Sequence, residues 1–280
     1  MLIDCHNHTH NSPDGENESV LERCARAAEL GIGVLAVTDH CEVNRFFSLA
    51  HYGVEPNGYD TYDFGRDFEL SMQENTAAKA HTPAGVKLLC GIELGQATHE
   101  LALAEHVYAD VRLDFVIGSV HMTRDETGWF DLFYIDGDRD DAYYHAVIDA
   151  YLEEELRLAQ WGRFSVLGHL TLPVRCINEM RHKNLSFRPH MAQVEEILRT
   201  AITKGVGIEC NTNRGNTPLP DAEILKLYRS LGGEIITLGS DAHTAQHLGC
   251  AVQARQELLR SCGFRYFTTF DRMKPSFQAL

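Results

Sequence analysis

The feature that most constrains the fold of this chain is a short apolar run that recurs seven times and ends each time on a polar side chain. Runs of four to eight apolar residues are typical of strands buried on both faces. Six of the runs end on His, Asp or Glu, and the seventh ends on Asn211. The runs occupy residues 2–6, 34–40, 88–93, 115–121, 164–169, 206–211 and 235–241. Strands of this kind would carry their polar ends to one common rim.

Segments with helical periodicity lie between these runs. Apolar residues at three- and four-residue spacing predict helices over residues 18–30, 140–161, 190–203, 221–231 and 245–262. Pro189 and Pro220 are typical of helix starts, and Gly31, Gly205 and Gly232 are typical of helix ends. Strands that alternate with helices form a parallel sheet with the helices outside it. Seven strands rather than eight predict an incomplete or distorted barrel.

Composition limits the size and the partners of the protein. The chain has 280 residues, of which 44% are hydrophobic, and this is enough for one large domain. Its net charge of −15 argues against nucleic acid or an acidic membrane surface as the main partner. The sequence has no uninterrupted run of 18 apolar residues, so we expect neither a transmembrane helix nor a signal peptide. The eight cysteines form no C-x-x-C pair, so we expect reduced core residues and a cytoplasmic protein.

Two long segments follow predicted strands and are expected to be insertions at the rim, at about residues 45–85 and 122–137. A long connection on the functional rim of a barrel more often encloses substrate than links domains. The second segment passes through Trp129 and Phe130, and the first ends in a predicted helix that leads to His81. The first segment also carries aromatic and acidic side chains, namely Phe46, Phe47, Tyr52, Tyr59, Asp60, Tyr62, Asp63, Phe64 and Asp67.

The candidate metal ligands begin with His6 and His8, which a strand of period two points to the same side. Taken alone, such a pair is as often incidental as functional. His10 continues the alternation but falls where the strand should end. Asp14 would by itself be a turn aspartate, and its interpretation as a ligand depends on the other candidates.

The other candidates each follow a predicted strand, and glycine precedes or neighbours several of them, as expected where the backbone lies close to a cluster. Any one of them could be an ordinary polar residue at a strand end. Nine residues at the same topological position instead predict a metal centre. These nine are His6, His8, Asp14, His40, Glu93, His121, His169, Asp241 and His243.

With these motifs in view, the chain resembles the polymerase and histidinol phosphatase (PHP) superfamily, and within it the histidinol-phosphate phosphatases. The matching signatures are H-x-H-T at 6–9, S-x-D-G at 12–15, T-D-H at 38–40, G-x-E at 91–93, G-S-V-H at 118–121, G-H at 168–169, E-x-N-T at 209–212 and G-S-D-A-H at 239–243. The resemblance covers essentially the whole chain in the expected order. It implies a distorted (β/α)7 barrel with a trinuclear metal centre at the carboxyl rim.

The resemblance also implies how the ligands divide among two to three divalent ions. His6, His8, Glu93 and Asp241 would hold the first ion. Glu93 would bridge to a second ion, held by His121 and His169, and Asp14, His40 and His243 would hold the third. Some relatives carry His at the position of Asp14. Zinc, iron and manganese are all used in the superfamily, and a mixture of imidazole and carboxylate suits each of them.

The activity implied is a metal-dependent phosphomonoesterase that hydrolyses L-histidinol phosphate in histidine biosynthesis. Divalent ions lower the pKa of bound water from about 15.7 towards ~7, which supplies a nucleophile, and they neutralise phosphoryl oxygens. Glu93, Asp241 and His243 would act through the metal centre. Arg175 and Arg214 follow rim strands where histidinol phosphatases tend to carry basic residues, and we predict that both bind phosphate.

Two alternatives belong to other functional classes. The first is a PHP phosphoesterase of another specificity, acting on a nucleotide or a nucleic-acid end. The strong acidity and the lack of a Lys/Arg stripe argue against it. The second is a non-catalytic zinc protein, which needs only four closed ligands rather than nine.

Overall fold

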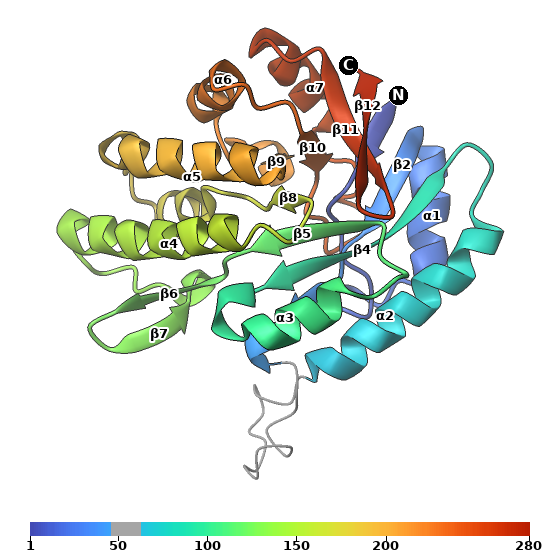
Figure 1. Cartoon of the computed structure of the whole chain (residues 1–280), viewed down its shortest axis with the longest axis horizontal. Helices are drawn as coiled ribbons and strands as arrows, with labels where there is room; N and C mark the ends of the chain where they lie inside the picture. The colour runs from blue at the N-terminus through green and yellow to red at the C-terminus, as the bar shows by residue number, and fades with distance from the viewer. Residues whose placement is uncertain (46–62) are drawn as a thin grey trace.

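The computed structural model describes residues 1–45 and 63–280, and its centre is one parallel sheet (Figure 1). The strand order is β1-β2-β4-β5-β8-β9-β10, and the short β3 pairs with the carboxyl part of β4. The strands are β1 (Leu2–Asp4), β2 (Ile32–Val37), β3 (His40–Glu42), β4 (Lys87–Gly95), β5 (Phe115–Ser119), β8 (Val166–Leu167), β9 (Gly207–Asn211) and β10 (Ile236–Gly239). The seven predicted apolar runs therefore all contain strands, and these strands are nearly or wholly buried.

The sheet curls until its first and last strands meet. The Cys5 N–H donates to the Leu238 carbonyl at 2.8 Å, and the Asp241 N–H donates to the His6 carbonyl at 2.7 Å. A nearly closed barrel of seven parallel strands results, and this confirms the predicted distorted barrel. All seven strands run in the same direction, so their carboxyl ends form one rim, which we call the carboxyl rim.

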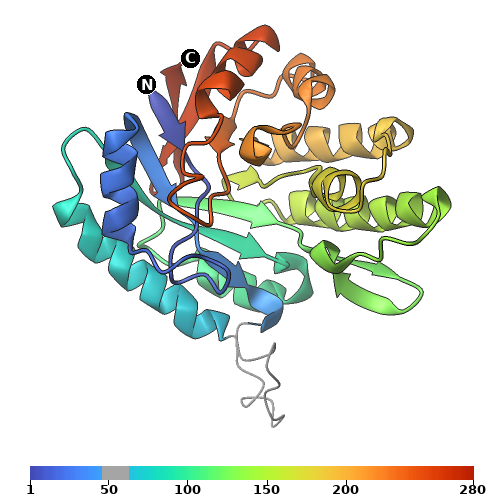
Figure 2. The same cartoon turned by 180° about the vertical axis from the view of Figure 1, so that it is seen from behind.

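Helices cover the outside of the barrel, as both views show (Figure 1, Figure 2). They are α1 (Val20–Glu29), α2 (Phe64–Ala78), α3 (Leu101–Tyr108), α4 (Asp141–Trp161), α5 (Met191–Lys204), α6 (Ala222–Ser230) and α7 (Val252–Ser261). Side chains cap several of them at the first turn; Ser19 and Glu22, for example, form a reciprocal capping box on α1. In the described part of the chain, no helix is long and apolar enough to cross a membrane.

One helix is shorter than its prediction. The pattern predicted a helix over residues 245–262, but α7 begins only at Val252. Gly249 has φ +69° and Ala251 has φ +60°, and this left-handed backbone cannot continue a right-handed helix. The first third of the predicted helix is therefore a series of turns.

The two predicted rim insertions differ in what the structure describes of them. Residues 122–137 contain a β-hairpin of β6 (Met122–Asp125) and β7 (Gly128–Asp131), which lies beside α4 (Figure 1). In the first insertion, the helix predicted before His81 is present as α2. Phe46, Phe47, Tyr52, Tyr59, Asp60 and Tyr62 lie outside the described residues.

A second hairpin, which the sequence pattern did not predict, covers the amino end of the barrel. Its strands are β11 (Tyr266–Asp271) and β12 (Lys274–Ala279). The hydroxyl of Thr268 accepts a hydrogen bond from the Ile236 N–H at 3.2 Å. The rings of Phe270 and Phe115 are 5.1 Å apart. Ile236 and Phe115 are the first residues of β10 and β5, so this hairpin closes the end opposite the carboxyl rim.

Candidate metal centre

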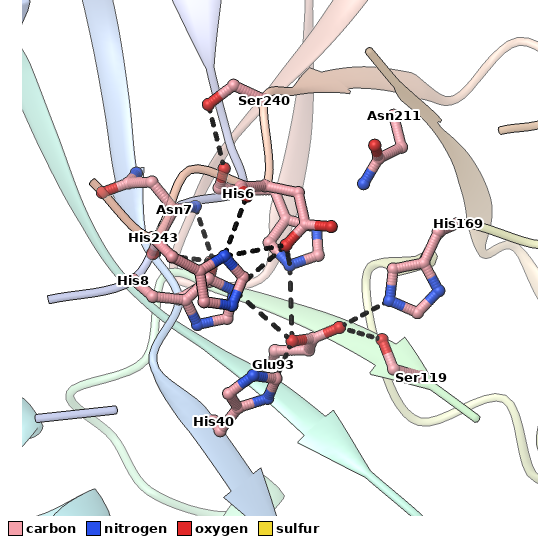
Figure 3. A network of polar contacts seen from close by, with 12 residues as sticks. His6, Asn7, His8, His40, Glu93, Ser119, His169, Asn211, Ser240 and His243 are labelled. Atoms are coloured by element: carbon pink, nitrogen blue, oxygen red, sulfur yellow. Dashed lines mark hydrogen bonds and ion pairs between the residues drawn. The ribbon is translucent and has the colours of Figure 1, made fainter. Parts of the chain in front are cut away.

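Side chains from the carboxyl rim converge on Glu93, near the end of β4 (Figure 3). The Glu93 carboxylate is 1% exposed, and its two oxygens face different histidines. Oε2 lies 3.0 Å from His40 Nδ1 and 3.4 Å from His6 Nε2. Oε1 lies 2.9 Å from His169 Nε2 and 3.1 Å from His121 Nε2. One carboxylate can therefore contact ions on both of its sides.

The first group of candidate ligands lies on the Oε2 side of Glu93. Asp241 Oδ1 is 3.6 Å from His6 Nε2 and 3.4 Å from His8 Nε2. His8 Nε2 is in turn 3.6 Å from Glu93 Oε2. Asp241 has a φ of +56°, a backbone conformation that non-glycine residues adopt mainly where the surrounding structure enforces it. The turn after β10 thus aims this carboxylate at both imidazoles.

The remaining candidates form a second and a third group. On the Oε1 side of Glu93, His121 Nε2 lies 3.4 Å from His169 Nε2. Farther out, the half-exposed Asp14 reaches His243 Nε2 at 3.0 Å and His40 Nε2 at 3.5 Å. The structure therefore brings all nine predicted ligands together. Three sets have ligand atoms within 4.8 Å of one another: His6, His8 and Glu93; His8, His40 and His243; and His40, Glu93 and His121.

Within residues 1–45 and 63–280, four buried atoms of this cluster make no hydrogen bond, although neighbouring candidate ligands lie within ion-pair distance of them. They are His6 Nε2, His8 Nε2, His40 Nδ1 and Glu93 Oε2. Buried polar atoms in folded proteins are almost always paired, because an unpaired one loses the hydrogen bonds it would make to water. These four atoms point into the centre of the cluster. Imidazole nitrogen and carboxylate oxygen together suit zinc, iron and manganese, so the residues present fit divalent cations.

The electrostatics of the cluster also favour cations. Burial lowers the pKa of His6, His40 and His121, but the carboxylates around them outweigh it and raise each pKa well above the ordinary value. Burial likewise raises the pKa of Glu93, but the neighbouring histidines hold it well below the usual range. Glu93 is therefore ionised at neutral pH, as a metal ligand must be.

His8 differs from the other histidines of the cluster. Burial, together with His243 and His40 nearby, lowers its pKa to about 3. Its imidazole is therefore neutral at pH 7, the form in which histidine binds metal. The Ser12 hydroxyl lies 3.1 Å from Nδ1 of this ring.

Sequence reasoning missed the residues that support these candidate ligands from outside. Glu209 Oε1 lies 2.8 Å from His6 Nδ1, and Glu42 Oε1 lies 2.7 Å from His121 Nδ1. The Ser119 hydroxyl donates to Glu93 Oε1 at 2.7 Å. A period-two signal could have found two of them, since Glu42 follows His40 by two residues and Glu209 precedes Asn211 by two.

The two arginines predicted to bind phosphate lie in different surroundings. Arg175 donates to Asp241 Oδ2 at 2.7 Å, to Asn213 Oδ1 at 2.8 Å and to Asn211 Oδ1 at 3.1 Å. Its guanidinium lowers the pKa of Asp241 against the effect of burial. Arg214 is exposed, and among the described residues no side chain pairs with it. In this structure Arg175 orients Asp241, whereas Arg214 has its donors available.

Other residues singled out in the sequence lie apart from the cluster. His10 Nε2 is 2.7 Å from Glu74 Oε2, on α2. Asp63 accepts a hydrogen bond from the Arg66 N–H as the cap of α2, and Asp67 pairs with the Arg66 side chain. The Trp129 ring lies 4.5 Å from that of His99, and Phe130 packs against the core.

Comparison with known proteins gives a consistent result. The family model described as "PHP domain" matches residues 4–213. The chain is 26% identical to the histidinol-phosphatase of Lactococcus lactis, over 97% of this chain and 95% of that protein. It is 25% identical to a Thermotoga maritima protein named "Probable histidinol-phosphatase", over 95% and 94% of the two chains.

The fold is similar to that of a solved structure as well. The crystal structure of histidinol phosphate phosphatase from Lactococcus lactis has a TM-score of 0.75 to this chain, at 22% sequence identity. The match covers 98% of each chain. That crystal structure is described as a complex with zinc, L-histidinol and phosphate.

Proposed function

The chain belongs to the PHP domain family, and we propose from this premise that it is a metal-dependent histidinol phosphatase, which hydrolyses L-histidinol phosphate to L-histidinol and phosphate in histidine biosynthesis. The observation that carries the proposal is the convergence of buried imidazoles on the two oxygens of Glu93. Two relatives that align over nearly the whole chain are named histidinol-phosphatases. The similar crystal structure holds zinc, L-histidinol and phosphate.

We further infer that the cluster holds two to three divalent ions. Zinc is the ion named for the similar structure, and iron and manganese suit the same ligands. Glu93 would be shared between two ions, because its two oxygens face different histidines. The proposed ligand sets are His6, His8, Glu93 and Asp241 for the first ion, Glu93, His121 and His169 for the second, and Asp14, His40 and His243 for the third.

Bound divalent ions lower the pKa of water, which provides a nucleophile at neutral pH, and neutralise phosphoryl oxygens. The residues of the chain would position these ions, because Glu93 and Asp241 remain ionised and Arg175 holds Asp241 in place. His243, two residues after Asp241, completes the predicted catalytic set. The exposed Arg214 would bind the phosphate group of the substrate through its guanidinium.

A side-chain nucleophile is not needed, and the cysteines are poorly suited to be one. None of the eight forms a disulfide bond, and seven of them are buried. Burial raises the pKa of Cys210 and of Cys176 to about 12, so their thiolates are scarce at neutral pH. Unpaired cysteines throughout the chain also fit a reducing compartment, and we propose that the protein is cytoplasmic.

The substrate is tested by phosphate release from a panel of monoesters with purified, metal-replete protein. We expect kcat/KM for L-histidinol phosphate to exceed that for an uncharged phosphomonoester at least ~100-fold, which is about 2.7 kcal/mol and reasonable for one or two charge-assisted contacts. Equal turnover of both esters, or a preference for nucleotides or nucleic-acid ends, would leave a PHP phosphoesterase of another specificity. A metal-replete protein with no activity on any ester would contradict enzymatic function.

A further inference from the structure

A carboxylate outside the nine predicted ligands contacts the cluster of candidate ligands from its outer side. Glu42 is the last residue of β3, and its Oε1 lies 2.7 Å from His121 Nδ1. The other ring nitrogen of His121, Nε2, faces Glu93 Oε1 at 3.1 Å and His169 Nε2 at 3.4 Å. His121 is therefore held between a carboxylate on its outer side and the cluster on its inner side.

The register between β3 and β4 explains how Glu42 comes to this place. His40 pairs with Glu93, and Glu42 pairs with Gly95, two residues farther along each strand. Because side chains alternate along a strand, His40 and Glu42 point to the same face, as do Glu93 and Gly95. The strand that delivers His40 to the cluster thus delivers a second, acidic side chain beside it.

Gly95 provides the space that the Glu42 carboxylate occupies. A Cβ atom built on Gly95 would lie 2.0 Å from Glu42 Oε1 and 2.2 Å from both Cδ and Oε2. Three atoms of one carboxylate would have to move, so any side chain at position 95 would displace it. Gly95 has no left-handed φ, so its backbone conformation does not require glycine. The close approach of Glu42 is the reason for glycine that the structure provides.

We propose that Glu42 is a positioning residue for the second ion, and that Gly95 is required for it to act. A carboxylate accepts the hydrogen bond from Nδ1–H of His121, which fixes the tautomer whose Nε2 lone pair faces Glu93. This proposal deepens the proposed function and rests on its assignment of His121 as a metal ligand. Residues that orient a ligating histidine in this way typically contribute 10- to 100-fold to metal affinity or activity.

The second ion should depend on Glu42 more than on any support behind His169. His169 Nδ1 is buried and lacks a hydrogen-bond partner within residues 1–45 and 63–280. His6, at the first ion, has its own outer carboxylate in Glu209. Glu42 Oε1 also lies 3.7 Å from His40 Nδ1, but this is farther than the 2.7 Å to His121 Nδ1. Loss of Glu42 therefore chiefly removes the outer support of the second ion and leaves Glu209 in place at the first.

The experiment measures how much zinc the purified holoprotein retains against a graded series of chelator concentrations. The variants are Glu42→Ala, Glu42→Gln, Gly95→Ala and the double variant. Asp110→Ala is the matched control, because the Asp110 side chain is 15% exposed against 13% for Glu42, and it pairs with Arg112 away from the rim. Thermal unfolding of each variant verifies that it is folded.

We expect Glu42→Ala to lose one ion of the set at about 10- to 100-fold lower chelator concentration than the wild type. Glu42→Gln keeps an acceptor oxygen, so it should lose the ion at a chelator concentration less than about 10-fold below that of the wild type. Gly95→Ala should match Glu42→Ala although Glu42 is intact, and adding it to Glu42→Ala should change little, because the two act through one contact. Asp110→Ala should retain zinc like the wild type.

Two results would overturn the proposal. In the first, Glu42→Ala retains zinc as well as the wild type does. In the second, Glu42→Ala loses zinc but Gly95→Ala retains all of it. Because the readout is zinc rather than turnover, it separates this proposal from the proposed function. A wild-type protein inactive on histidinol phosphate, whose Glu42→Ala variant still loses an ion, would contradict the substrate and support the role of Glu42.

Discussion

The two ends of the barrel are built in opposite ways from the same strands. At the carboxyl rim, imidazoles and carboxylates are buried together, and several of their atoms make no hydrogen bond to any residue that the structure describes. At the amino end, the β11–β12 hairpin lies over the barrel with apolar contacts such as Phe270 on Phe115. The polar groups of the hairpin form hydrogen bonds there as well; for example, the Met273 N–H donates to the Asp114 carbonyl at 2.9 Å.

The difference shows where stability and function reside in this molecule. Unpaired buried polar atoms weaken a fold, so the four that meet around Glu93 indicate that the carboxyl rim is built for a ligand. At the amino end, hydrogen-bonded polar groups and buried rings contribute to stability, and they lie opposite the candidate metal centre. Substitutions at the carboxyl rim should therefore change ion binding and turnover. Substitutions at the amino end should change the free energy of unfolding.

Metal removal should have the largest effect, and only at the carboxyl rim. We expect chelation to reduce phosphate release at least about 1,000-fold, because the ions supply the nucleophile, and re-addition of zinc to restore it. Elemental analysis should find two to three ions per chain. At most one ion in active, freshly purified protein would contradict the proposed centre.

Single substitutions at the two ends should then separate turnover from stability. Glu93→Ala or Asp241→Ala should lower kcat by about 1,000-fold, since each removes a proposed ligand, while KM changes much less. Phe270→Ala should instead lower the free energy of unfolding by about 3–5 kcal/mol, because it deletes a buried ring.

The measurements are steady-state kinetics and urea unfolding of the same preparations. The folded fraction of Phe270→Ala should keep the wild-type kcat. If Phe270→Ala impaired turnover as strongly as Glu93→Ala, the functional separation of the two ends would be wrong.

The sequence predicted the carboxyl rim much better than the amino end, and the reason is physical. Seven strands, each ending on a chemically special residue, repeat one signal, and the fold then brings the nine candidates together. The β11–β12 hairpin has no such repetition. Its strands are joined through Arg272 and Met273, which adopt positive φ values, and the turn contains no glycine or asparagine by which a sequence pattern would recognise it. Glu42 was missed because its strand, β3, is only three residues long, and its one signal is the two-residue spacing from His40.

A third test concerns the two arginines near the rim. Arg214→Ala should raise KM by about 10- to 100-fold and leave kcat nearly unchanged, because an exposed guanidinium with available donors contacts substrate but holds no ligand. Arg175→Ala should also raise KM, and in addition lower kcat, because Asp241 loses the donor to its Oδ2.

Steady-state kinetics on histidinol phosphate distinguishes the two patterns. Arg188→Ala, which removes an exposed arginine in the turn before α5, is a control for general loss of positive charge. Unchanged KM and kcat in Arg214→Ala would remove that residue from the site. A pure KM effect in Arg175→Ala would show that its contact with Asp241 is unimportant for turnover.

One buried carboxyl lies on a helix that covers the barrel and is not among the candidate ligands. Glu155, on α4, is fully buried; its Oε1 accepts a hydrogen bond from the Tyr151 hydroxyl at 2.7 Å, and its Oε2 has no partner among the described residues. Burial raises the pKa of Glu155 from 4.5 to about 8, although Tyr151 and His121 oppose the shift. At neutral pH this carboxyl is therefore mostly protonated, in contrast to Glu93, whose neighbouring histidines keep it ionised.

The smallest predicted effect follows from this raised pKa. Between the pKa of about 8 in the folded protein and 4.5 in the unfolded chain, unfolding releases a proton from Glu155, so stability falls as pH rises through this window. From about pH 6 to about pH 8, the loss from this group is about 2 kcal/mol. Urea unfolding should show that Glu155→Gln lacks this loss, whereas Glu153→Gln, on the exposed side of α4, retains it. An identical pH dependence in wild type and Glu155→Gln would mean that Glu155 is ionised in the folded protein.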